Sequence, residues 1–294
     1  MTTKDAPVPT NPPQNKPLAI MSVDFEDYRR QELRDFGDDA APDFPEEIER
    51  QLDILLPLFE ESNIRATFFS VGRLGQALSR NAWDSIIKAG HRIGCHGHEH
   101  HRVYDLGPEG FKSDLAKAKA TLEDASGAPV VSFRAPYFSC DHCEPWFGSG
   151  LAETGFQVSS SHRYSALPNG LTGTLPLPGS DGRVIEAPLC SVGMGIKRLT
   201  VIGGTYFRLL PLSVIKHLMA RSRAKRFIPI VYLHNYDVDP DAAPLEYPGR
   251  TGMKRRLADR MRYTGRRGAI AKLKHLARLY QFQPVESLLD SEGQ

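Results

Sequence analysis

The sequence predicts an α/β protein: a distorted (β/α) barrel of about seven parallel strands with a basic helical C-terminal extension. Short continuous apolar segments recur along the chain, as in parallel strands that are buried on both faces. Segments with apolar residues at helical spacing separate them, and this alternation favours a parallel sheet that closes into a barrel. The length of 294 residues agrees, because α/β barrels reach about 250 residues as one domain.

Seven segments are expected to form the strands: 18–23, 65–71, 91–95, 130–133, 156–159, 184–187 and 228–233. Between them, the first helix begins at Pro45, with apolar residues at helical spacing as far as Phe59. Further helices are expected around 83–88, 111–125, 146–154 and 212–223, and the last in a basic tail over 250–280.

The predicted organisation has three parts. Residues 1–16 are polar and rich in proline, which indicates a disordered arm. Residues 17–249 form the barrel, and residues 250–294 form the extension packed on it. Residues 1–16 contain no apolar run typical of a secretory signal, and no apolar run approaches the roughly 20 residues of a membrane span. We therefore expect a cytoplasmic protein.

Charge is spread unevenly along the chain. The formal net charge is +2, yet residues 216–278 hold 16 Lys and Arg against 5 Asp and Glu. This excess indicates either an ordinary solvated helix face or an anionic partner. For residues 250–278 we expect peripheral contact with an anionic membrane surface, which would be the inner membrane. Nucleic acid is not an expected partner, because the chain carries no recognised nucleic-acid module.

Polar residues gather where the predicted strands end. They are Asp24, Glu26 and Asp27 after the first strand, His96 and His100 after the third, Arg134 after the fourth, and His234 at the end of the last. In a parallel barrel these positions meet at the C-terminal face, where barrel enzymes keep their active sites. The pattern therefore predicts one catalytic centre.

The segment 96–100 reads HGHEH and contains a His-x-x-x-His pair. Two imidazoles at that spacing can bind one cation, and a carboxylate from the acidic cluster completes a facial set with open positions. The sequence therefore predicts a divalent metal site.

Several segments together resemble a known family, the polysaccharide deacetylases with a NodB-homology domain (carbohydrate esterase family 4), and most closely its bacterial exopolysaccharide and O-antigen subgroup. The resemblance extends from about residue 18 to 282. It is carried by 22–28 (SVDFEDY), 66–69 (ATFF), 96–100 (HGHEH), 133–136 (FRAP), 203–208 (GGTYFR) and 232–234 (YLH).

The resemblance implies a role for each matching residue. Asp24 corresponds to the general base, and His96 and His100 to the metal-binding histidines. Asp27 is the preferred metal carboxylate, with Glu26 as the alternative. Arg134 corresponds to the arginine that holds the base, and His234 to the general acid. The implied cofactor is a divalent metal, with zinc preferred and Co, Ni, Mn or Fe as alternatives.

The implied reaction is metal-dependent hydrolysis of an N-acyl group, most readily N-acetyl, from an amino sugar in a bacterial surface polysaccharide or its lipid-linked precursor. Tyr137, Phe138 and Ser159 are candidate substrate-binding residues. The family usually carries an Asp at the position of Ser159 to orient the catalytic histidine, so this role would pass to Asp237 or Asp239. The alternatives are a catalytically impaired carbohydrate-binding homologue, and a deformylase or other C–N amide hydrolase of the same superfamily.

Overall fold

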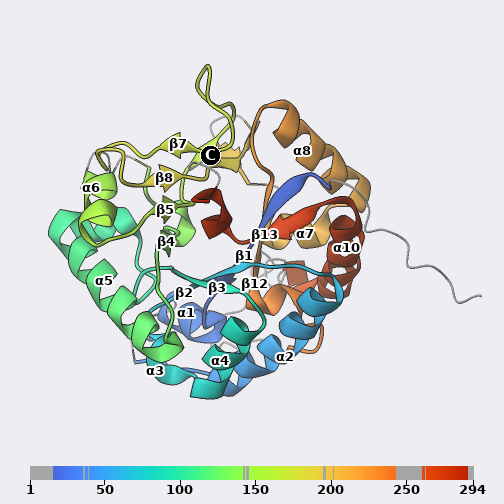
Figure 1. Ribbon diagram of the computed structural model, residues 1–294. Coiled ribbons are helices and arrows are strands. Elements are labelled where there is room, and N and C mark those ends of the chain that lie inside the picture. The colour runs from blue at the N-terminus through green and yellow to red at the C-terminus, as the bar shows by residue number, and fades with distance from the viewer. Residues whose placement is uncertain are drawn as a thin grey trace, which may run out of the picture.

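A curled, mainly parallel sheet organises the computed structural model (Figure 1). The structure describes residues 16–35, 37–38, 40–141, 143, 146–194, 197–200, 202–242, 260–261 and 263–290. Along the sheet the order is β12-β1-β2-β3-β4-β5-β8-β7, with β13 paired to β1. The strands are β1 (Leu18–Phe25), β2 (Thr67–Ser70), β3 (Arg92–Cys95), β4 (Ser132–Phe133), β5 (Val158–Ser159), β7 (Leu175–Pro176), β8 (Ile185–Glu186), β12 (Ile230–His234) and β13 (Gln281–Gln283).

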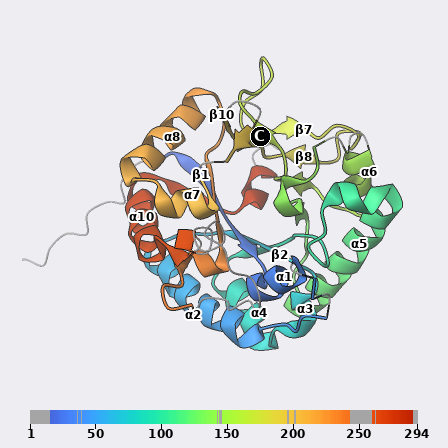
Figure 2. The same ribbon diagram turned by 180° about the vertical axis from the view of Figure 1, so that it is seen from behind.

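Helices lie around the outside of this sheet, as the two opposite views show (Figures 1 and 2). In α2, Ile48, Leu52, Leu55 and Phe59 are buried at the predicted helical spacing. The helices are α1 (Tyr28–Asp35), α2 (Pro45–Glu61), α3 (Leu74–Ala77), α4 (Arg80–Lys88), α5 (Val103–Ser126), α6 (Trp146–Glu153), α7 (Gly204–Leu209), α8 (Leu212–Ala224) and α10 (Arg266–Leu279).

Short elements fill the connections. Two small sheets pair β6 (Arg163–Tyr164) with β9 (Leu189–Cys190), and β10 (Val192–Met194) with β11 (Lys197–Leu199). Three 3₁₀ helices are η1 (Pro136–Phe138), η2 (Asn235–Val238) and η3 (Val285–Leu288).

β1 is the centre of the sheet. Seven of its eight residues are buried, as expected for a parallel strand covered on both faces. Its C-terminal half pairs with β2, with Asp24 opposite Phe69, whereas Leu18 and its neighbours pair with β13. The N–H of Arg65, just before β2, donates to the carbonyl of Phe282 in β13. β13 is thus inserted where the N-terminal ends of β1 and β2 separate.

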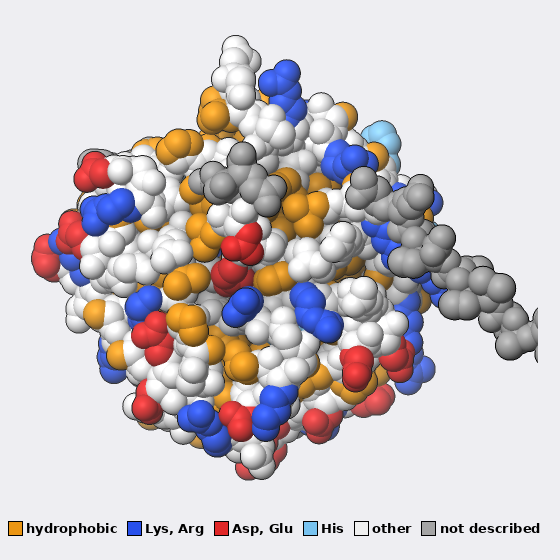
Figure 3. All heavy atoms as spheres, in the orientation of Figure 1, with side chains coloured by type: hydrophobic (Ala, Val, Ile, Leu, Met, Phe, Trp, Pro, Cys, Tyr) orange, Lys and Arg blue, Asp and Glu red, His pale blue; other side chains and the backbone are white. Residues whose placement is uncertain are grey.

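The 3₁₀ helix η3 follows β13 and lies at the N-terminal ends of the strands. The half-buried Glu286 carboxylate accepts hydrogen bonds from Thr67 at the start of β2 (2.6 Å) and from Ser132 at the start of β4. Burial raises the pKa of Glu286. Figure 3 shows this face of the molecule, with acidic side chains in a central hollow and basic side chains beside them. That hollow is lined by Arg92, Glu286 and Asp290 among other residues.

The predicted α/β class and the curled parallel barrel are confirmed, although the described pairings leave β12 and β7 as unjoined ends. The structure also adds three helices that the sequence did not predict, α1, α3 and α7, and the residues of α1 lack an apolar period. The N-terminal arm (1–16, of which only Lys16 is described), the 249/250 boundary and much of the basic segment 250–278 fall outside the described residues.

Candidate active site

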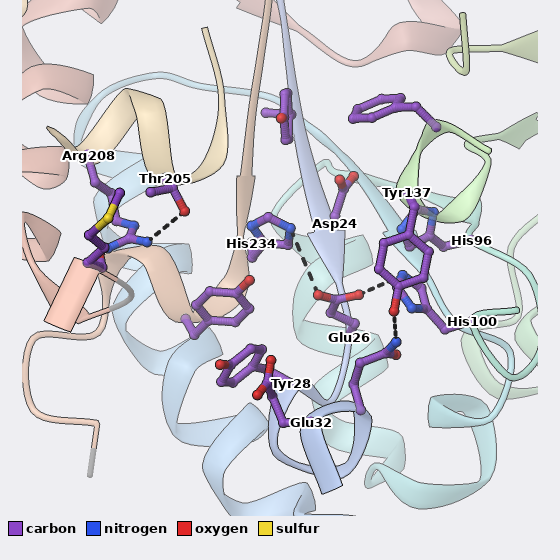
Figure 4. Close-up of a pocket in the computed structure, with 15 residues that line it drawn as sticks. Asp24, Glu26, Tyr28, Glu32, His96, His100, Tyr137, Thr205, Arg208 and His234 are labelled. Atoms are coloured by element: carbon purple, nitrogen blue, oxygen red, sulfur yellow. Dashed lines mark hydrogen bonds and ion pairs between the residues drawn. The ribbon is translucent and has the colours of Figure 1, made fainter. Parts of the chain in front are cut away.

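A cavity of about 420 Å³ opens at the carboxyl ends of β1, β3 and β12. Figure 4 shows side chains from several parts of the chain pointing into it. It is lined by Asp24, Glu26, Tyr28, Gln31, Glu32, His96, His100, Tyr137, Phe138, Thr205, Arg208, Tyr232, His234, Tyr236 and Met261. Asp24, His96, His100 and His234, which the sequence assigns to one catalytic face, therefore do meet there.

Glu26 lies between imidazoles at the floor of this cavity. One carboxylate oxygen is 2.9 Å from His100 Nε2, and the other is 3.9 Å from His234 Nε2. One ligand atom each from Glu26, His96 and His100 lie within 4.8 Å of one another, and all three residues are buried. Burial alone would raise the pKa of Glu26, but the charge and hydrogen bond of His100, with the charges of His234 and His96, lower it to about 2.

The His96 imidazole is oriented from behind. Its Nδ1 is 2.7 Å from the carbonyl oxygen of Arg134, so the ring directs Nε2 toward the cluster. Burial lowers the pKa of His96 to about 4, which keeps the ring neutral at physiological pH. A neutral imidazole held by a backbone carbonyl is the usual form of a metal-binding histidine.

Asp27, the carboxylate preferred from the sequence, lies outside this cluster. Its two oxygens accept backbone N–H groups, from Arg30 at 3.0 Å and from Phe44 at 2.6 Å. Because Arg30 is in the first turn of α1, the carboxylate acts as an N-terminal helix cap. Glu26 is the acid that the structure places beside the two histidines, so the preference for Asp27 is corrected in favour of the alternative.

Asp24 is held by a buried arginine. Arg134 Nη1 donates to Asp24 at 2.7 Å and to Ser22 at 2.8 Å. Its Nε and Nη2 donate to the carbonyl and hydroxyl of Ser160, and its guanidinium lies 4.3 Å from the ring centroid of Phe69. With its donors occupied, Arg134 fixes the Asp24 carboxylate at the cavity wall and compensates its charge.

His234 lies at the end of β12, where it is the register partner of Asp24 in β1. Its Nδ1 is 3.1 Å from Asp237 Oδ2, so Nε2 is the nitrogen that faces Glu26. Burial alone would lower the pKa of His234, but the hydrogen bond and charge of Asp237, with the charges of Glu26 and Asp24, raise it to about 9. Of the two acids considered from the sequence, Asp237 contacts the histidine, whereas Asp239 binds Arg50 at 2.6 Å.

Two glycines allow α7 to approach this histidine. An ideal Cβ on Gly203 would lie 2.0 Å from the ring of Tyr232, and one on Gly204 would lie 3.3 Å from His234. Gly204 also has a positive φ of 50°, which favours glycine. The motif 203–208 therefore brings Arg208 close to His234. The sequence indicated this motif through the resemblance but assigned no role to Arg208.

The three candidate substrate-binding residues differ in position. Tyr137 and Phe138 line the cavity, and Tyr137 is 41% exposed with its ring 4.7 Å from that of His100. Ser159 is fully buried, and its hydroxyl donates to Ser161 at 3.0 Å. Since Ser159 does not reach the cavity, its predicted substrate contact is wrong.

Two family models match separate parts of the chain. Residues 38–143 match the model described as polysaccharide deacetylase, and residues 158–290 match a domain of unknown function, DUF3473. A peptidoglycan deacetylase of Helicobacter pylori is 28% identical over 109 residues, which are 35% of this chain and 37% of that protein. A bifunctional xylanase/deacetylase of Pseudobutyrivibrio xylanivorans is 23% identical over 88 residues, 30% of this chain and 15% of that protein. The chain thus spans well under half of either relative.

Solved structures share the fold. One is a Mycobacterium smegmatis protein assigned as a polysaccharide deacetylase, with a TM-score of 0.57 at 19% identity, covering 99% of this chain and 94% of that one. Another is a peptidoglycan N-acetylglucosamine deacetylase in complex with 4-naphthalen-1-yl-N-oxidanyl-benzamide, with a TM-score of 0.50 at 15% identity, covering 94% and 89%. The chain therefore shares the fold of these structures, and its residues 38–143 are similar to the polysaccharide deacetylase model.

Proposed function

We propose that this protein hydrolyses the N-acyl amide, most readily N-acetyl, of an amino sugar in a bacterial surface polysaccharide or its lipid-linked precursor. The observation that carries the proposal is the arrangement around one cavity: Glu26 with two histidines, and beside them an Asp24–Arg134 pair and a His234–Asp237 pair at neighbouring strand ends. Amide hydrolysis at a cation site requires a base and an acid, and these two pairs can supply both.

The residues present fit a divalent metal. A buried carboxylate and two imidazoles, one of them fixed by a backbone carbonyl, form the His-His-carboxylate set typical of open catalytic sites. Glu26, His96 and His100 would hold the ion, with zinc as the preferred metal. When bound, such an ion lowers the pKa of water and polarises the acyl carbonyl.

The remaining steps belong to side chains of this chain. Asp24 accepts a proton from the attacking water as the new C–O bond forms. His234 Nε2 donates a proton to the amide nitrogen as the C–N bond breaks, so that the products are a carboxylic acid and the free amine. Arg134 keeps Asp24 in place, and Asp237 keeps the His234 ring turned with Nε2 toward the reaction.

Tyr137 and Phe138 are the proposed contacts for the sugar ring, since both line the cavity and Tyr137 presents an exposed aromatic surface. The alternative of a catalytically impaired homologue rested on the missing acid at Ser159. The contact between Asp237 and His234 removes that reason.

The test measures metal content and released acyl group together. Wild-type protein, supplied with zinc after chelation, is incubated with N-acetylated amino-sugar oligomers, and free acetate and the product mass are measured. His96→Ala and His100→Ala should lose both metal and activity. His101→Ala is the matched control, because His101 lies in the same loop but contacts Arg34 at 2.8 Å instead of the cluster.

Failure of the metal-loaded wild type to release acetate would overturn the deacetylase proposal, and release of formate from formylated substrates would favour the deformylase alternative. Full metal occupancy in both histidine variants would exclude the proposed ligands.

The place of action is a further part of the proposal. None of the described helices is long and apolar enough to cross a membrane. We propose that the protein acts in the cytoplasm, with peripheral contact to anionic lipid through residues 250–278. Binding to anionic vesicles that is lost at high salt supports this contact.

A further inference from the structure

A buried arginine connects the proposed catalytic histidine to the C-terminal part of the chain. Arg208 Nε lies 2.6 Å from Asp237 Oδ1, and both side chains are almost fully buried, with 1% and 0% exposed. The other oxygen of the same carboxylate, Oδ2, accepts the backbone N–H of His234 at 2.9 Å and lies 3.1 Å from its Nδ1. Asp237 therefore bridges the arginine and the histidine.

The other nitrogens of Arg208 are anchored as well. Nη1 donates to the carbonyl oxygens of Thr264 (2.6 Å) and Met261 (3.1 Å), and Nη2 donates to the Thr205 hydroxyl (3.1 Å). A guanidinium is planar and its donors have fixed directions, so the hydrogen bonds of Nη1 and Nη2 determine its position and rotation, while Nε and Asp237 Oδ1 form an ion pair outside hydrogen-bond geometry. A lysine ammonium could not make this set of contacts.

The segment that supplies these carbonyls is itself attached to α7. Gly265 has a φ of +85°, and a Cβ there would lie 2.7 Å from the carbonyl oxygen of Arg208. Lys272 Nζ donates to the same carbonyl at 2.7 Å and to that of Phe207 at 2.9 Å. The start of α10 therefore packs closely against the carboxyl end of α7.

We propose that Arg208 is a positioning residue for His234, and that residues 260–272, with 262 outside the described set, act as a clamp that holds Arg208 in place. This inference rests on the proposed function, in which His234 protonates the leaving amine. Asp237 alone could rotate about its side-chain bonds, but the 2.6 Å contact with an immobilised arginine fixes one oxygen and leaves the other for His234. The C-terminal segment thereby determines the direction of a proton transfer in which it has no direct part.

The test compares two substrates with different leaving groups. Amide cleavage of an N-acetyl amino-sugar oligomer needs a proton on the leaving nitrogen, whereas 4-nitrophenolate leaves from 4-nitrophenyl acetate without one. Arg208→Met, Arg208→Lys and Asp237→Asn should lower kcat for the amide by about 10- to 100-fold. KM and activity on the ester should change by less than about 3-fold, because base and metal ligands are untouched.

Lys274→Gln is the matched control. Lys274 is also a cation of α10, but it pairs with Glu61 at 2.7 Å on the surface and does not contact α7 in any described interaction. We expect its amide and ester activities to equal those of the wild type. An equal loss on both substrates in the Arg208 variants would indicate general structural damage and would overturn the proposal.

A measurement without substrate separates this inference from the proposed function. In protein labelled with ¹⁵N-histidine, the Nδ1–H of His234 is assigned by its absence in His234→Gln. We expect this resonance to be lost or shifted upfield in Arg208→Met and unchanged in Lys274→Gln. A wild type that cleaves neither substrate would contradict the proposed function, while this spectrum would still decide the positioning role. An unchanged resonance in Arg208→Met would overturn it, and Arg208→Lys replaces that variant if Arg208→Met does not fold.

Discussion

Two adjacent carboxylates at the end of β1 are expected to have different roles. Replacing each of them separately distinguishes the residue that binds the metal from the residue that stabilises the fold. Glu26 faces His96 and His100, whereas Asp27 accepts the N–H groups of Arg30 and Phe44. Glu26→Gln should therefore lose metal and keep its fold, and Asp27→Ala should keep metal and lose stability.

The magnitude for Asp27→Ala follows from its two accepted hydrogen bonds. Removing an N-terminal cap costs about 1 kcal/mol, and the second bond, to Phe44, contributes about 1–3 kcal/mol. The sum of about 2–4 kcal/mol lowers Tm by about 5–15 °C, at about 2–4 °C per kcal/mol for a large domain. Asp27→Asn should lose less than Asp27→Ala, because the amide oxygen can keep one of the two accepted hydrogen bonds.

For Glu26→Gln the expected change is in affinity. The variant replaces one of three protein ligands by a weakly coordinating amide. Losing a residue that only hydrogen-bonds to a metal ligand lowers metal affinity by up to about 100-fold, so losing the ligand itself should lower zinc affinity by more than that. The backbone N–H of Glu26 still donates to Asn235 at 3.1 Å, which keeps the local chain conformation. We expect the metal-free variant to stay folded, with a Tm lowered by the loss of the Glu26–His100 ion pair.

Isothermal titration with zinc and thermal unfolding with and without zinc measure both quantities on the same samples. The wild type should gain stability on adding zinc, Asp27→Ala should gain as much from a lower starting Tm, and Glu26→Gln should gain little. The reasoning is refuted if Asp27→Ala loses zinc binding at an unchanged metal-free Tm while Glu26→Gln still binds zinc tightly.

Three further outcomes are expected. Asp24→Asn should keep its metal but lower amide hydrolysis by about 10²- to 10⁴-fold, and near-wild-type acetate release would exclude Asp24 as the base. Glu186→Gln should destabilise the protein by about 3–5 kcal/mol, because Glu186 counteracts the effect of burial and raises the pKa of His162 to about 12. The stabilisation from the Glu186–His162 pair is complete below the unfolded histidine pKa of 6.5 and is lost as pH rises toward 12. In urea unfolding, the free energy of unfolding of the variant should therefore differ more from that of the wild type at pH 6 than at pH 9. An equal difference at the two pH values would contradict the assignment. Gly203→Ala should lower stability by about 1–3 kcal/mol through overlap with the Tyr232 ring, and an unchanged Tm would show that the ring moves freely.

Much of the fold could be predicted because its central strands are continuous apolar segments. β1 and β12 are buried over nearly their whole length, and this leaves a strong sequence signal. The short strands β7 and β13 were missed because, unlike β4, β5 and β8, they do not lie in a continuous apolar segment. α1 was missed for another reason: its residues are almost all polar, and it is stabilised by the Asp27 cap and contacts with neighbouring loops.

The positions of Asp24, His96 and His234 at the cavity could be predicted, because each of them lies at or directly after the end of a predicted strand. The sequence preferred Asp27 and kept Glu26 as the alternative, because the family's two adjacent acids are spaced apart in this chain, and the structure favours Glu26. Alternation along a strand would have indicated Glu26, since residues two apart share a face and Asp24 faces the cavity. Arg208 could not be assigned from the sequence, because its contact with Asp237 depends on how α7 packs and not on a local spacing.

The insertion of β13 between β1 and β2 affects the order in which the chain can fold. Leu18 in the first strand pairs with Gln281 in the last, so the centre of the sheet is complete only after nearly the whole chain has been synthesised. At about 5–20 residues per second, β1 emerges from the ribosome roughly 10–50 s before its partner. During that interval part of an apolar strand has no hydrogen-bonding neighbour, which exposes the nascent chain to aggregation. We therefore expect chains cut before β13 to be retained by chaperones, and activity to appear only after synthesis has passed residue 283.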